Sequence, residues 1–65
     1  MERTREEIIQ IIEEKIKGMT YEQKLNELKE WRFRIDMINH WDNEDKLWWN
    51  ILSEKIKELL IEGDK

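Results

Sequence analysis

Two helix-start motifs of the same form constrain the fold of this chain more than any other sequence feature. Thr4 is followed by Glu7, and Thr20 is followed by Gln23, each at the spacing of a capping box. In this motif the threonine hydroxyl accepts a hydrogen bond from a main-chain amide three residues later. The Glu or Gln side chain at that position accepts a hydrogen bond from the threonine N–H. Each motif therefore predicts the first turn of a helix.

A third start and two stops complete the pattern. Asp42 precedes further acids, which favours a helix beginning near residue 43. Gly18 and Gly63 follow apolar, Lys-containing segments, as expected just past helix C-termini. The sequence also lacks the alternating β-branched runs of strands. We therefore predict an all-α protein, in which residues 1–65 form one domain of three short antiparallel helices, at about 5–17, 21–40 and 43–62, packed as a helical bundle.

Composition and charge exclude several classes of protein. The chain has 65 residues, no Cys and a net charge of −4. Disulfide scaffolds and cysteine zinc sites are excluded, and the negative charge argues against binding to a phosphate backbone. The apolar runs are too short to span a membrane, and no signal-peptide pattern is present. We therefore expect an acidic cytoplasmic protein that binds neither nucleic acid nor membranes.

The middle helix is predicted to have two apolar faces. The main stripe runs from Tyr21 to Ile38, and a second row contains Phe33, Met37 and Trp41 at spacings of four residues. Helix 43–62 can cover the main stripe. We expect the second row to lie at a contact with another chain, including helix 5–17 of a partner protomer, with Arg34 and Glu30 as a polar rim. Helix 5–17 of the same chain is the competing cover.

The other helices have one main apolar face each. That of helix 5–17 is made of isoleucines, and that of helix 43–62 contains Trp48, Trp49, Leu52 and Ile56, with Ile51 predicted to lie outside it. An acidic row that includes Glu54 and Glu58 is either simply solvated or a docking strip for a basic partner. Because four Trp residues are difficult to bury in so small a domain, we expect a homodimer.

Few residues favour catalysis or ligand binding. Asp36 and His40 have helical i, i+4 spacing, but a hydrogen-bonded histidine at a helix end is a simpler interpretation than a metal site. Arg32 and Arg34 adjoin aromatic residues and could form an anion pocket. We expect no enzymatic activity, no catalytic or metal-binding residue and no cofactor, and a small ligand is not favoured.

The stretch from Leu28 to Ile56 resembles small helical accessory proteins of phages and mobile elements of Gram-positive bacteria. The resembling residues are Leu28, Phe33, Ile35, Met37, His40-Trp41, Glu44-Asp45, Leu52 and Ile56. The resemblance covers less than half of the chain. It implies a phage-type accessory role, such as an anti-defence inhibitor of a host enzyme or immune effector.

The leading functional hypothesis is therefore a small protein-interaction module, which inhibits its target by stoichiometric binding. One alternative is a homo-oligomer that sequesters a nucleotide-like ligand through Arg32 or Arg34 and an aromatic ring. Another is a de novo designed helical mini-protein, which the Glu, Lys and Ile content favours and the adjacent Trp48 and Trp49 oppose.

Overall fold

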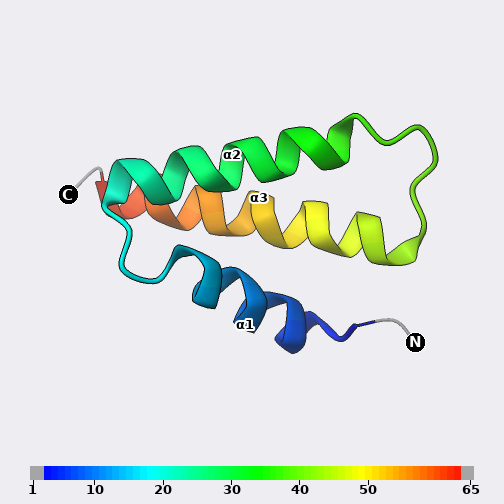
Figure 1. The fold of residues 1–65 in the computed structure, drawn as a ribbon, viewed down its shortest axis with the longest axis horizontal. Helices are drawn as coiled ribbons and strands as arrows, with labels where there is room; N and C mark the ends of the chain where they lie inside the picture. The colour runs from blue at the N-terminus through cyan, green and yellow to red at the C-terminus, as the bar shows by residue number, and fades with distance from the viewer. Residues whose placement is uncertain (1–2, 64–65) are drawn as a thin grey trace.

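Three helices account for the regular structure of the computed structural model, which describes residues 3–63. They are α1 (Arg5–Ile16), α2 (Tyr21–Asp36) and α3 (Asn43–Gly63), and no strand occurs among the described residues. In Figure 1, α2 and α3 run side by side in opposite directions, and α1 lies along the other side of α3. The prediction of an all-α chain with three helices is confirmed.

Both capping boxes form as predicted. The Glu7 amide donates to Thr4 Oγ1 at 3.3 Å, and the Gln23 amide donates to Thr20 Oγ1 at 3.2 Å. At the third start, the Asp45 amide donates to Asp42 Oδ1 at 2.8 Å. These bonds satisfy amides that helix starts leave without intrahelical partners, and they place the beginnings of the helices where the sequence predicts them.

The C-terminal end of α2 differs from the prediction of a helix that continues to residue 40. The helix ends at Asp36, with Met37 as its C-cap. The indole Nε1 of Trp41 donates to the Ile35 carbonyl at 2.9 Å, and the Ile38 amide donates to the same carbonyl at 3.0 Å. Because these groups satisfy a carbonyl that a longer helix would use, the chain can turn here without a Gly or Pro signal.

The central element is α3 rather than α2. It packs extensively against α2 and has α1 along its other side (Figure 1), although α1 makes few contacts with either helix. For this reason Ile51, predicted to lie outside the main face of its helix, is only 1% exposed. Eight apolar side chains form the core: Ile8, Ile12, Ile16, Leu28, Ile35, Ile51, Leu52 and Ile56.

Replacing Leu28 by Ala should lower the free energy of unfolding by about 3 kcal/mol, because Leu28 is fully buried and its loss leaves a cavity. Urea denaturation followed by circular dichroism measures the change. Asn26→Ala, at an exposed position of the same helix, is the matched control and should change this free energy by less than about 0.5 kcal/mol. Equal effects of the two substitutions would contradict the placement of the core.

Candidate interaction surface

An exposed apolar pair lies on the side of α2 that neither α1 nor α3 covers. Phe33 and Met37 are 63% and 69% exposed, and their spacing of four residues places them one turn apart on the same helix face. A shallow hollow of about 500 Å³ is lined by Phe33 together with Lys29, Glu30 and Arg34. We call these five residues the outer α2 patch.

The charges around the pair are opposite in sign and freely hydrated. Arg34 Nη2 lies 3.9 Å from Glu30 Oε2, with side chains 72% and 68% exposed. An ion pair this exposed contributes little to stability because water and salt screen it. Both groups can therefore turn to a charged partner at little cost in folding free energy.

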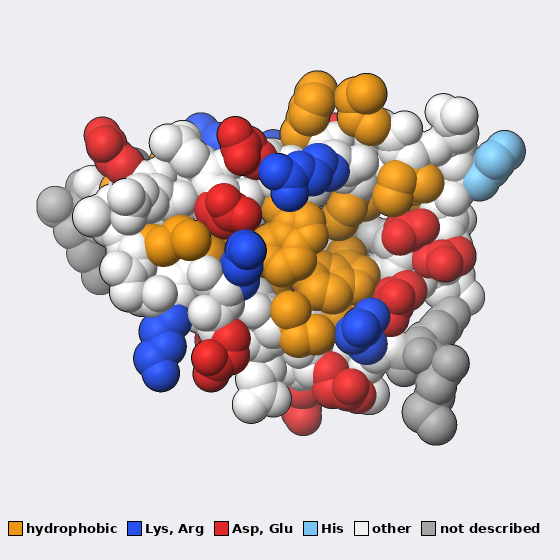
Figure 2. All heavy atoms as spheres, viewed as in Figure 1, with side chains coloured by type: hydrophobic (Ala, Val, Ile, Leu, Met, Phe, Trp, Pro, Cys, Tyr) orange, Lys and Arg blue, Asp and Glu red, His pale blue; other side chains and the backbone are white. Residues whose placement is uncertain are grey.

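Figure 2 shows how hydrophobic side chains are distributed over one face of the molecule. One group fills the middle of the face, and another projects at the edge formed by α2. Half-buried indoles contribute to the contact between α2 and α3, where the ring centroids of Trp31 and Trp48 lie 5.2 Å apart. Among residues 3–63, Phe33 and Met37 have no such cover.

Trp41 does not extend the apolar pair into the continuous row of three that the sequence predicts. The helix ends at Asp36, and the Trp41 ring is half-buried, with its centroid 5.9 Å from that of Trp49. Its indole Nε1 donates to the Ile35 carbonyl. Trp41 therefore belongs to the packing at the α2–α3 turn, and the contact of Phe33 and Met37 with another chain stays a prediction.

The two arginines considered for an anion pocket are separated by the fold. Arg32 Cζ lies 5.5 Å from the centre of the Trp49 ring, and Arg32 Nη1 donates to Ser53 Oγ at 3.3 Å. Arg32 thus faces α3, and only Arg34 borders the hollow beside Phe33. The hollow thus carries Lys29, Arg34 and the Glu30 carboxylate, and the anion pocket built on both arginines does not form.

The predicted acidic row on α3 has cationic partners from within the chain. Glu54 accepts a bond from the Arg5 guanidinium, and Glu58 Oε2 lies 3.8 Å from Lys55 Nζ. Lys55 also donates to Glu13 Oε1 of α1 at 3.1 Å. Glu54 therefore pairs with α1 and Glu58 with its own helix, which reduces the negative charge that the row presents to a basic partner.

The predicted Asp36–His40 neighbourhood is not helical, since α2 ends at Asp36. Asp36 Oδ1 instead accepts a bond from Trp49 Nε1 at 3.1 Å, and His40 is exposed in the following loop. Among residues 3–63, no cluster of three or more His, Asp or Glu side chains is arranged to hold a metal ion.

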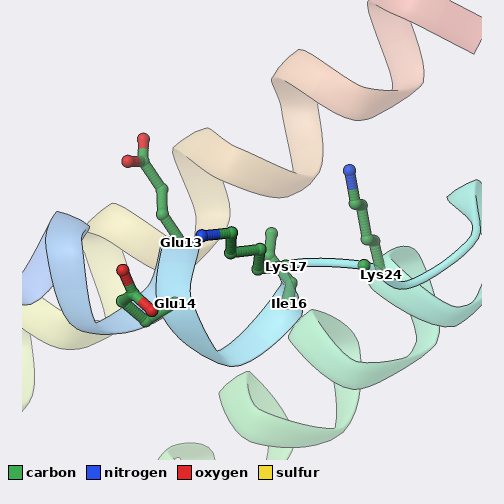
Figure 3. Close-up of a pocket in the computed structure, with 6 residues that line it drawn as sticks. Glu13, Glu14, Ile16, Lys17 and Lys24 are labelled. Atoms are coloured by element: carbon green, nitrogen blue, oxygen red, sulfur yellow. The ribbon is translucent and has the colours of Figure 1, made fainter.

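A second hollow, of about 440 Å³, lies at the end of α1 and carries both signs of charge. Figure 3 shows Glu13 and Glu14 from α1, Lys17 from the turn that follows and Lys24 from α2 around it. Its two acids and two lysines balance, and Glu13 is already bonded to Lys55. This hollow offers neither the apolar surface nor the net charge that would select a partner.

Sequence reasoning missed one member of the outer α2 patch. Lys29 lines the hollow beside Phe33. The signal was present, because residues four apart on a helix share a face, and Lys29 precedes Phe33 by four positions. The predicted apolar row extends only to the C-terminal side of Phe33, so it does not include Lys29.

Comparisons of the chain with protein-family models, curated proteins and solved structures found no match. The resemblance to helical accessory proteins of phages and mobile elements therefore stays a prediction. Within residues 3–63, no helix is both long enough and apolar enough to cross a membrane.

Phe33→Ser should change the free energy of unfolding by less than about 0.5 kcal/mol at low protein concentration, because the ring contributes little to the fold of a single chain. Trp41→Ala should lower it by about 2 kcal/mol or more, because the substitution removes a half-buried ring and a hydrogen bond. Urea denaturation measures both changes in free energy. It is carried out at a protein concentration on the order of 5 to 10 µM, at which a weak dimer is dissociated. The reverse order of effects would show that Phe33 serves the fold.

Proposed function

We propose that this protein is an interaction module that acts by stoichiometric binding of another polypeptide chain through the outer α2 patch. The observation that supports the proposal most strongly is the exposure of Phe33 and Met37, the two most exposed large hydrophobic side chains among residues 3–63. Adjacent exposed apolar side chains inside a polar rim are typical of protein contact sites.

The chemistry of the patch suits a protein ligand. Phe33 offers a rigid aromatic anchor, and the flexible thioether of Met37 can adapt to the surface it meets. Removing each side chain from water contributes about 1.5 to 3 kcal/mol for complete burial. Lys29, Glu30 and Arg34 add charged groups at the margin, where they select a partner by charge and remain partly hydrated.

Two finer forms of the proposal concern the partner's identity. In the first, suggested by the resemblance in sequence, the target is a host enzyme or immune effector that the protein inhibits. In the second, homodimerisation completes a helical bundle by adding a helix against α2. Both need the outer α2 patch to be free in the single chain, and the exposure of Phe33 supports that condition.

Photo-crosslinking tests the proposal whatever the identity of the partner. Phe33 is replaced by benzoylphenylalanine, and Glu14, exposed on α1, carries the same group in a matched control. Irradiation in cell extract should give an adduct of one discrete mass at position 33 and none at position 14. Adding Met37→Glu should suppress the adduct, because a charge within the patch opposes burial of its apolar pair.

The crosslinked chain is then identified by mass spectrometry, and it can be another protein or a second copy of this one. A series of adducts of equal strength at positions 33 and 14 would contradict the proposal. So would the absence of any protein adduct at position 33 when the intact, folded protein is irradiated at high extract concentration.

A further inference from the structure

We propose that the occupant of the outer α2 patch is a second copy of this chain, whose α2 lies antiparallel to the first across a two-fold axis beside Phe33. This inference rests on the proposed function, since it names the partner for the same surface. Two observations carry it: the arrangement of charges along α2, and the area that the single chain leaves exposed.

Each flank of the Phe33–Met37 pair carries one acid and one base. Glu30 and Arg34 lie on one side of the Phe33–Met37 pair, whereas Lys29 and Asp36 lie on the other, as the helical repeat of 3.6 residues requires. All four residues are exposed. A surface with both signs on each flank favours neither a strongly acidic nor a strongly basic partner.

An antiparallel copy of α2 brings opposite charges together on both flanks at once. In such a pair, each flank meets the same flank of the other chain in reversed order. If the two-fold axis passes at the level of Arg32, Glu30 faces Arg34 of the second chain. If it passes between residues 32 and 33, Lys29 faces Asp36 of the second chain. The two charge pairs therefore close around nearly the same axis, which places the two Phe33 rings against each other.

The groups needed for these contacts are available in the single chain. The intrachain distance of 3.9 Å between Arg34 and Glu30 is long, and both side chains are well exposed. Asp36 uses Oδ1 for the Trp49 indole, so its second carboxylate oxygen can accept from Lys29 of the other copy. Pairing between copies therefore requires no bond of the fold to break.

The exposed area is consistent with a partner of modest size. The chain exposes 5178 Å², whereas a compact monomer of 8.2 kDa exposes about 4,500 Å². The excess, about 700 Å², is of the order that one subunit contributes to an interface, for which about 800 Å² is standard. We therefore expect a dimer that dissociates at micromolar concentrations rather than an obligate one.

Complementary charge reversals test the arrangement. Glu30→Arg and Arg34→Glu are prepared separately, with Glu14→Arg and Lys57→Glu as matched controls of the same charge change at exposed positions outside the patch. Sedimentation equilibrium from about 10 µM to about 1 mM spans the affinity range of a weak complex. The unmodified chain and both controls should approach about 16 kDa, twice the chain mass of 8.2 kDa, as expected for a closed two-fold dimer.

Each patch variant alone should weaken dimerisation at least about tenfold, because like charges then meet across the axis. An equimolar mixture of the two variants should restore it, since every Arg of one chain then faces a Glu of the other. Restoration on mixing cannot come from the Glu30–Arg34 pair within one chain, because that pair remains like-charged in both variants. Circular dichroism verifies that each variant keeps its helices.

Three outcomes overturn the inference. The first is an unmodified chain that is still monomeric at about 1 mM, on the order of the weakest specific affinities. The second is dimerisation that neither single variant weakens. The third is a mixture of the two variants that dimerises as weakly as each variant alone. The first outcome leaves the proposed function standing if position 33 still crosslinks to a different protein. Absence of both the dimer and any adduct at position 33 overturns the two together.

Discussion

The packing of two indoles against the end of α2 is the constraint on which the rest of the structure depends. Trp41 donates to the Ile35 carbonyl, and Trp49 donates to Asp36, so the last turn of α2 is held from the loop and from α3. Their rings also pack against each other. This contact ends the helix, reverses the chain and aligns α2 with α3. It also leaves Phe33 and Met37 on the uncovered side of α2.

Much of the fold was predictable because its signals are local. The threonine capping boxes and the apolar spacing depend on residues a few positions apart, and the helix starts follow them. The end of α2 was not predictable in this way, because it depends on the side chain of Trp41 reaching back to Ile35. The burial of Ile51 likewise depends on the docking of α1 on α3, a long-range contact that periodicity does not encode.

The candidate surface was predictable in part for the same reason. Phe33, Met37 and Arg34 share one face of a regular helix, so their spacing alone places them together. Trp41 does not share that face because the helix ends before it. The acid Glu54 pairs with Arg5 of α1, and Glu58 pairs with Lys55 of its own helix. The sequence pattern does not predict which aromatic side chains pack between helices and which are exposed. The tryptophans pack at the contact between helices, and the single phenylalanine faces outward.

The central claim is that α2 uses one face for α3 and keeps the other for a second chain. An isotope-filtered NMR experiment tests it most directly. Protein labelled with ¹³C is mixed with unlabelled protein at about 1 mM, on the order of the upper limit for weak specific binding. We predict intermolecular contacts between the Phe33 ring protons of the two chains, together with Phe33 shifts that change on dilution. Phe33 signals independent of concentration, without any intermolecular contact, would contradict the account.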